Sequence, residues 1–429
     1  MTARWAGVVV AAMVLSGAAP LRADEADTAA LKAEIELLKN RLAQLEGRVA
    51  AQQPLAAVAS KFGEKPALPT LELPSGLAGL QMSGYADIAY GYNFNEADPP
   101  TTANSGRAFD NESHGFTPHA FELVLEKPPS DELPFGFRTD LFFGDDAEVF
   151  HSTGLGASTD NFDLQQAYIT YLAPVGDGID LKVGKFVTLL GAEVIESPAN
   201  WNYSRSLMFM NSIPFTHTGA LASYPIGEWG SVTGGVVNGW DIVDDNNKAK
   251  SFLGNLTLTP IESLTLSSNV VSGPERARDS RNKRTVISNI VTWTTPLEGL
   301  TLMANYDYGR ESGLAQGTAA TKGFEPASWQ GLALYGKYDV TDIWSLAGRW
   351  EWFDDRDNVR TRLTTLGSST PPDLDFYEYT LTSQWKLREH VLARLEYRHD
   401  KADERVFTHD DGGLSTVMDT VAAELIYHF

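Results

Sequence analysis

Three charged residues, Glu193, Glu196 and Arg205, stand close together in the stretch 187–215. Carboxylates and a guanidinium that face each other across water set up a transverse electric field, and such a field filters charged solutes in a narrow pore. These side chain types are suited to filtering a solute rather than to catalysing a reaction. We therefore expect the three residues to lie at the narrowest point of a channel.

The stretch that carries them is long, since connections of more than about 12 to 15 residues are usually functional or disordered. Its apolar residues need burial, while its polar residues need water. The lumen of a wide β-barrel satisfies both, because one side of the segment packs on the inner wall and the other borders water. There, Trp201 and Tyr203 either stack on a sugar-like or aromatic solute or pack against the wall.

The placement of histidines argues against catalysis, which needs a nucleophile with a base within hydrogen-bond reach. Of the eight histidines, His119, His217 and His428 stand singly in predicted strands, and the others lie in or beside loops and turns. Neither a G-x-S-x-G motif nor a paired metal-ligand spacing accompanies them. We expect no enzymatic activity, no metal and no cofactor, and an outer-membrane hydrolase is the remote alternative.

The composition narrows the class of protein. The 429 residues are 43% hydrophobic and carry a formal charge of −22 with no cysteine. This apolar content excludes a helical membrane protein, and the missing cysteine excludes disulfides and thiolate metal sites. The acidic balance argues against nucleic acid as a partner. It fits either a solvated exterior or a channel that favours cations.

Three segments precede the predicted barrel. Residues 1–23 are predicted to be a secretory signal, because a short apolar run follows Arg4 and ends at small residues. Residues 53–80 form a proline-rich, semi-rigid linker. Between them, residues 24–52 predict a coiled-coil helix that either self-associates or packs on the barrel. Its seam consists of Leu31, Ile35, Leu38, Leu42, Leu45 and Val49.

Residues 81–429 alternate apolar and polar side chains along sixteen segments, which predicts β-strands. In the first segment, Met82, Ile88 and Phe94 share one face, while Asp87 and Asn93 share the other. Short turns and long polar loops alternate strictly, which is typical of an all-β, 16-stranded antiparallel outer-membrane barrel with both termini at the periplasmic, short-turn rim. The segments are 81–95, 116–127, 135–143, 162–173, 179–186, 216–225, 230–240, 250–259, 264–271, 285–294, 300–309, 328–339, 344–353, 374–385, 391–400 and 415–429.

Aromatic residues collect at the segment ends beside the short turns, where the interfacial belt of a membrane barrel lies. A soluble core would place its aromatics near strand centres instead. The chain ends on Phe429, which looks like the signal by which barrel-assembly machinery recognises its substrates. The belt residues are Phe135, Tyr171, Tyr224, Trp293, Tyr338, Trp344 and Trp385.

Three stretches of this sequence resemble the OmpL-like β-barrel porins. They are GYADIAYGYNFN at 84–95, AYITYLAPVGDGIDLKVGKFVTLLGAEVIESPANWNYSRSLMFMNSIPFTHTG at 167–219 and GVVNGWDIVDDNN at 235–247. The resemblance covers most of residues 80–429 and implies an outer-membrane pore, without naming a solute. By analogy with porins of this strand number, the connection after the fifth strand, 187–215, folds into the barrel. Large general porins are commonly trimeric, so we also expect a homotrimer.

Inward-facing positions of the predicted strands carry ten acids and six bases, so we hypothesise a weak preference for cations. The alternative is mutual neutralisation, of Arg349 by Glu351 and of Arg394 and Arg398 by Glu396. The charges expected to line the lumen are Glu122, Arg138, Asp140, Lys182, Asp307, Arg349, Glu351, Glu378, Arg394, Glu396 and Arg398, together with Asp87, Glu126, Asp180, Lys337 and Glu424.

Two loop clusters suggest further partners. The oxygen ligands of one loop could hold calcium, but the loop lacks the glycine and closing glutamate of an EF-hand, so a solvated loop is preferred. These ligands are Asp241, Asp244, Asp245, Asn246 and Asn247. The basic run 276–284 either contacts lipopolysaccharide phosphates or is solvated. The predicted function is a porin through which small hydrophilic solutes or ions diffuse across the bacterial outer membrane, filtered at 187–215. The alternative is an outer-membrane anchor or adhesin with a plugged barrel.

Overall fold

The computed structural model describes residues 77, 79–95, 104–130, 132–313, 326–365, 373–410 and 412–429. These residues belong to the compact unit Pro74–Phe429. The predicted secretory signal, the coiled-coil seam from Leu31 to Val49 and nearly all of the 53–80 linker lie outside the described residues.

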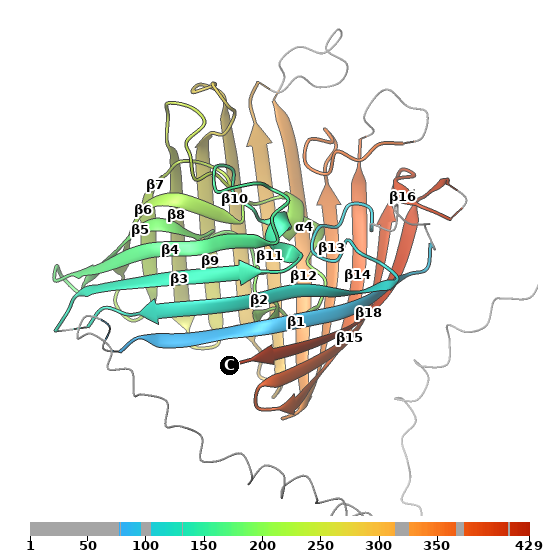
Figure 1. The fold of residues 1–429 in the computed structure, drawn as a ribbon, viewed down its shortest axis with the longest axis horizontal. Coiled ribbons are helices and arrows are strands. Elements are labelled where there is room, and N and C mark those ends of the chain that lie inside the picture. Colours follow the sequence, from blue (N-terminus) through green and yellow to red (C-terminus); the bar gives the residue numbers. More distant parts are fainter. Residues whose placement is uncertain are drawn as a thin grey trace, which may run out of the picture. The chain divides into compact units, whose positions relative to one another are not determined.

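Sixteen antiparallel strands close into a barrel, with β1 paired to β18 at the seam (Figure 1). The prediction of a 16-stranded barrel is confirmed. β16 (Phe407–Thr408) and β17 (Leu414–Ser415) form a separate two-stranded sheet. The barrel strands are β1 (Gln81–Asn93), β2 (Gly115–Lys127), β3 (Phe135–Phe143), β4 (Phe162–Ala173), β5 (Ile179–Val187), β6 (Thr216–Pro225), β7 (Gly230–Val237), β8 (Ser251–Ile261), β9 (Leu264–Pro274), β10 (Lys283–Thr294), β11 (Leu300–Glu311), β12 (Ala327–Thr341), β13 (Trp344–Asp354), β14 (Asp375–Arg388), β15 (Val391–Ala402) and β18 (Val417–His428).

Along the strands, mostly apolar side chains face outward and most polar side chains face the lumen, while some inward apolar residues form a buried cluster. In β1, Met82 and Ile88 are 64% and 51% exposed, whereas Asp87 and Asn93 are 1% and 2% exposed. An apolar exterior around a polar interior inverts the arrangement of a soluble protein, and it suits lipid outside and water inside. The alternation therefore has the orientation of a membrane barrel.

Long and short connections alternate around the barrel, as the sequence predicted (Figure 1). The turns 226–229 and 342–343 join strand ends at one rim, and the loops 188–215, 238–250 and 355–374 lie at the other. An even number of strands brings the start of β1 and the end of β18 to the short-turn rim. Among the described residues, no helix has the length and apolarity needed to cross a bilayer.

Aromatic side chains mark the short-turn rim. Phe135 and Tyr171 stack with ring centroids 4.6 Å apart at an interplanar angle of 28°, and Trp344 lies opposite Trp385 in the register of β13 and β14. Trp293 is 41% exposed although it is large and apolar. Exposed aromatics at one height fit the interfacial belt that the sequence predicted.

The end of the chain closes the barrel at this rim. The Phe429 backbone N–H donates to the Gly84 carbonyl at 3.0 Å, and the Gly84 N–H donates to the Phe429 carbonyl at 3.1 Å. A Cβ at Gly84 would lie 2.1 Å from the Glu122 carbonyl oxygen. Only glycine fits there, because β1 and β2 approach each other closely at this point.

Candidate pore constriction

The connection between β5 and β6 folds into the barrel and packs on its inner wall. It carries a short 3₁₀ helix, η2 (Ser197–Ala199), and α4 (Leu207–Asn211), which contacts β12 and β13. Met208 and Phe209 of α4 are 2% and 4% exposed and belong to the main apolar cluster. A Cβ at Gly331 would lie 2.6 Å from Met208 Cγ, so glycine in β12 makes room for α4. We call residues 188–215 the inward loop.

Two wall carboxylates bind backbone N–H groups of the inward loop. Glu351 accepts from Leu207 at 2.7 Å and from Met208 at 2.6 Å. Glu396 accepts from Tyr203 at 2.7 Å and from Ser204 at 3.0 Å. Both carboxylates are near the middle of their strands, so they fix the loop at mid-height in the barrel. The Leu207 and Met208 N–H groups begin α4 and have no partner within the helix, which is why they need these acceptors.

Three wall arginines bind the carbonyl groups of the same loop. Arg349 donates to the Ser204 carbonyl at 2.6 Å, and Arg398 donates to the Arg205 carbonyl at 2.7 Å. Arg394 donates to the carbonyls of Ser197 at 3.1 Å and Asn200 at 2.6 Å. Alternating acids and arginines thus match the alternating donors and acceptors of the loop backbone. We call Arg349, Glu351, Arg394, Glu396 and Arg398 the wall clamp.

Among the described residues, no ion pair joins any two of the three predicted filter charges. The Glu193 carboxylate lies 2.6 Å from Arg349 Nη1 and accepts the Ser206 N–H at 2.7 Å. Arg205 is 2% exposed and donates to the carbonyls of Val194, Ile195 and Tyr203. Both side chains therefore hold the shape of the loop. Of the three, Glu196 alone is half-buried, and it turns towards β2 and β4.

The two aromatic residues of the loop also contact protein. The Tyr203 hydroxyl lies 2.9 Å from His119 Nε2, and His119 Nδ1 lies 2.9 Å from Asp146 Oδ1 in α3 (Asp146–Val149). Trp201 packs edge-on against Tyr335, with ring centroids 6.4 Å apart. From the sequence, His119 was predicted to stand alone in its strand. Its two partners, Asp146 and Tyr203, are 27 and 84 positions away, so local spacing does not reveal them.

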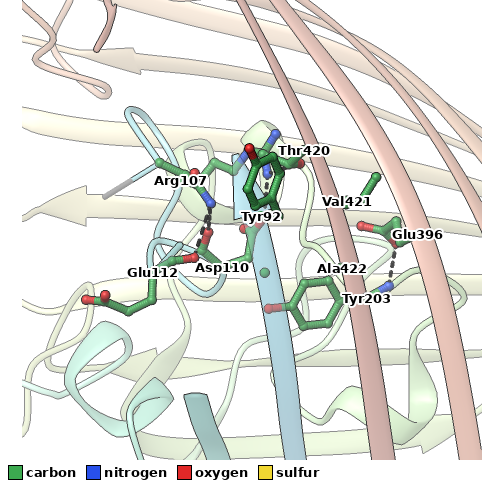
Figure 2. Close-up of a pocket in the computed structure, with 11 residues that line it drawn as sticks. Tyr92, Arg107, Asp110, Glu112, Tyr203, Glu396, Thr420, Val421 and Ala422 are labelled. Carbon is green, nitrogen blue, oxygen red and sulfur yellow. Dashed lines mark hydrogen bonds and ion pairs between the residues drawn. The ribbon is translucent and has the colours of Figure 1, made fainter. Parts of the chain in front are cut away.

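The first long loop also enters the barrel, which the sequence did not indicate. Arg107 donates to Asp400 Oδ2 and Thr420 Oγ1 at 3.0 and 2.9 Å, and it pairs with Asp110 at 2.7 Å. Phe109 packs on the inward loop, 5.7 Å from the ring of Phe209. A cavity of about 10 Å³, roughly the space one water molecule needs, remains beside Arg107 and Asp110, towards the inward loop (Figure 2).

The remaining lumen charges form ion pairs, either between neighbouring strands or, as with Arg398 and Asp400, two positions apart on one strand. Arg349 pairs with Glu378 at 2.7 Å, Arg394 with Glu424 at 3.0 Å and Arg398 with Asp400 at 2.8 Å. Arg349 with Glu351, and Arg394 with Glu396, make no such pair among the described residues. The other predicted charges lie on the wall as follows: Arg138 pairs with Asp140 and Glu126, Lys182 lies 4.4 Å above the Tyr168 ring, and Asp307 accepts from Asn305 at 2.6 Å.

The strands β6 to β9 contain no acidic residue, lysine or arginine, and their inward positions near the short turns are polar, whereas Leu221, Val237, Leu253 and Val271 are buried in the apolar cluster. Ser223 bonds Thr233 at 2.8 Å, and Asn255 bonds Ser267 at 2.9 Å. All four side chains are half-buried rather than buried. This side of the lumen is therefore exposed to water, in contrast to the packed side at β12 to β18.

Neither loop cluster gathers its charges in the way a ligand site would. Asp241 accepts backbone N–H groups, and Asp245 pairs with Lys250. In the basic run, Arg284 pairs with Glu311 at 2.7 Å. These contacts use the groups within the protein.

Asp241 fixes the end of the inward loop, and its ionisation gives a pH prediction. Its Oδ1 accepts the N–H groups of Phe215 and Thr216 at 2.8 and 2.9 Å. Burial raises the pKa of the Asp241 carboxyl to about 6, although these two donors oppose the rise. The pKa of Asp241 is higher in the folded state than in the unfolded state. Its contribution to the free energy of unfolding is therefore greatest below a pH of about 4 and is lost as the pH rises through about 6, by up to about 3 kcal/mol.

Asp241→Asn should remove this pH dependence. Asparagine keeps the acceptor oxygen and tolerates the positive φ of 53° at this position. We expect the guanidinium midpoint of the wild type to fall between pH 4 and pH 7, and that of the variant to fall less. Asp245→Asn serves as the control and should keep the wild-type profile. A wild-type profile in Asp241→Asn would contradict the assignment.

The comparison with known families decides the identity of this barrel. The sequence profile of the family "Putative beta-barrel porin-2, OmpL-like" matches residues 79–429. The chain belongs to this porin family. No protein of the curated set matches its sequence.

Solved structures share the fold of this porin at low sequence identity. The anion-selective porin from Comamonas acidovorans has a TM-score of 0.56 and 10% identity over 82% of this chain and 99% of that chain. The outer-membrane channel DcaP of Acinetobacter baumannii has a TM-score of 0.53 and 12% identity, over 82% of this chain and 97% of that chain. The trimer form of OmpT of Vibrio cholerae has a TM-score of 0.51 and 10% identity, over 82% of this chain and 99% of that chain. Family and fold together place the porin in the bacterial outer membrane.

Proposed function

We propose that this porin is a passive diffusion channel for small hydrophilic solutes or ions, filtered at the inward loop. The observation that carries the proposal is the wall clamp, which holds a folded segment at mid-height beside an uncharged, water-exposed wall. A barrel of about sixteen strands leaves an open lumen. A segment fixed across part of that lumen narrows it without closing it. Passage then depends on solute size and charge and needs no catalytic group.

Recording from planar bilayers tests the channel directly. We expect purified protein to insert in discrete conductance steps, because water fills the lumen beside the inward loop. The competing function is an anchor or adhesin whose barrel is plugged. Silent bilayers, obtained with protein that folds and inserts, would favour that alternative over diffusion.

The lumen should prefer cations weakly. Each inward-facing arginine of the wall has a carboxylate partner. Among the described residues, three acids (Glu122, Glu351 and Glu396) have no lysine or arginine at ion-pair distance, against two bases (Lys182 and Arg205) that have no carboxylate at that distance. Unpaired carboxylates leave the lumen negative, and a negative lumen favours cations. Reversal potentials in a gradient of potassium chloride measure this preference. Selectivity for chloride would defeat the hypothesis.

Export and assembly follow from the same function. We infer that a signal at residues 1–23 directs the chain across the inner membrane and that both ends of the barrel face the periplasm. Phe429, at the closing seam, is proposed as the residue that barrel-assembly machinery recognises. Lipopolysaccharide is the expected contact of the long-loop rim, where the basic run 276–284 lies.

A homotrimer is the proposed assembly, with the seam from Leu31 to Val49 as one means of association. Solved porin-like structures include a trimer form, and a heptad seam associates helices by burying its apolar positions. Deleting residues 24–52 should weaken the oligomer on unheated gels. The full-length protein is the control, and an unchanged oligomer band in the deletion variant would count against the seam.

A further inference from the structure

Three carboxylates from three separate elements, none of which carries the wall clamp, meet in the lumen. Glu122 of β2, Asp140 of β3 and Glu196 of the inward loop each offer an oxygen, and these oxygens lie within 4.8 Å of one another. Glu122 is 3% exposed and Asp140 is 0% exposed. Like charges so close together repel strongly when they are buried, so such a cluster either holds a cation or keeps a proton on one of its carboxyls.

Arg138 supplies only part of the compensating charge. Its Nε lies 2.9 Å from Asp140 Oδ1, and its Nη1 lies 3.2 Å from Glu126, a fourth acid outside the cluster. One guanidinium against three carboxylates leaves the cluster with two negative charges in excess. A single divalent cation would balance that excess.

A second observation points to a missing ligand. Glu122 Oε1 is buried without a hydrogen-bond partner among the described residues. Gln165 is fully buried, and its Nε2 donates to Glu196 Oε1 at 2.6 Å while its own Oε1 has no partner. Rotating the Gln165 amide by half a turn would present Oε1 to the cluster. Buried carboxylate and amide oxygens without partners are costly unless something binds them.

We propose that Glu122, Asp140 and Glu196, with Gln165, bind one calcium ion. All the available ligand atoms are oxygens, which suits a hard cation and not zinc or copper. Calcium lies about 2.4 Å from its ligands, so two oxygens on opposite sides of the ion are about 4.8 Å apart. The spacing of this cluster falls within that limit. Glu196 is half-buried, which gives the ion access from the lumen.

Calcium at this position would tie the inward loop to a second wall. The wall clamp binds the loop to β13 and β15, whereas the calcium ligands Glu122 and Asp140 belong to β2 and β3. The ion would therefore hold the loop to two further strands and reduce the negative charge beside the water path. The inference deepens the proposed function, although binding itself does not depend on conductance.

Isothermal titration calorimetry on the folded, detergent-solubilised porin, stripped with EDTA, tests the site. We expect the wild type to bind one calcium ion per chain, more tightly than magnesium. Glu122→Gln and Glu196→Gln should each weaken calcium binding about tenfold or more, because each removes a charged ligand. Glu126→Gln is the matched control, since Glu126 lies on the same strand and bonds Arg138 but is outside the cluster.

The outcomes separate the site from the channel. Absence of calcium binding by the wild type, or binding by Glu122→Gln and Glu196→Gln as tight as that of Glu126→Gln, would overturn the proposal. Tighter binding of magnesium than of calcium would also overturn it. The heat-dependent gel shift of a folded barrel shows whether each variant has folded. Residue 196 lies in the inward loop, so Glu196→Gln leaves the strand pairing intact. Calorimetry needs no bilayer. Calcium binding by a protein that shows no conductance would therefore refute the diffusion function and leave the calcium site standing.

Discussion

Removing the inward loop should raise the single-channel conductance several-fold. Thr188 N–H donates to the Phe215 carbonyl at 2.9 Å, and Val187 lies opposite Thr216 in the register of β5 and β6. Residues 189–214 can therefore be replaced by Asn-Gly, which makes a two-residue hairpin turn. The wall strands keep their hydrogen bonds, and the freed arginines and carboxylates of the clamp become hydrated. Planar-bilayer recording measures the increase.

A point variant separates loss of the loop from loss of its anchoring. In Glu351→Gln with Glu396→Gln, each amide NH₂ faces a backbone N–H that the carboxylate accepted, so both anchors weaken by about 1.5 to 3 kcal/mol each. We expect a smaller rise in conductance with more open-channel noise. Glu228→Gln with Glu298→Gln removes the same formal charge from exposed short turns and should leave the conductance unchanged. Equal conductance in the excised and wild-type channels would refute the loop as the constriction.

Arg349→Met should destabilise the folded barrel by about 3 to 5 kcal/mol, because it leaves two buried carboxylates without their cation. Arg349 is 3% exposed and pairs with Glu378 and Glu193 at 2.7 and 2.6 Å. Methionine has a similar length but no charge or donor. The guanidinium midpoint measures the loss, with the heat-dependent gel shift as a check on folding.

Two further variants show whether uncompensated charge causes this loss. Lys337→Met removes another inward base, but its partner Asp339 is half exposed and the pair should contribute at most about 1 kcal/mol. Adding Glu193→Gln and Glu378→Gln to Arg349→Met removes the stranded charges and should recover much of the stability. Wild-type stability in Arg349→Met alone would refute the role of Arg349 in the clamp.

The barrel could be predicted from the sequence because its signals are local. Alternation with a period of two, turn residues and loop lengths each depend on neighbouring residues. The strand ends differ from the predicted ones by at most three residues: β10 begins at Lys283 rather than 285, and β7 ends at Val237 rather than 240. The inward path of the loop after the fifth strand was also predicted, from its length and its mixture of apolar and polar residues.

The partners of the charged residues could not be predicted, because they depend on register and on contacts distant in sequence. Arg349 and Glu351 share a face of β13 without pairing, whereas Arg398 and Asp400, which have the same spacing on β15, pair at 2.8 Å. Spacing along a strand therefore does not decide the partner. Arg394 pairs with Glu424, which lies directly opposite it on β18, and Glu351 accepts from the loop backbone. The same reason hid the cluster of Glu122, Asp140 and Glu196, whose members come from two strands and a loop.

The wall clamp has a consequence for biosynthesis. The inward loop is made early, yet Glu351 and Glu396 follow their partners by 144 and 193 positions in the chain. Until those later hairpins arrive, the amides of α4 have only water to bind, so the narrow part of the channel is the last to acquire its structure. A truncated chain that lacks the final hairpins could still pair its early strands, but its loop would have no anchor, and an incomplete barrel would differ from a finished one at its centre as well as at its open edge.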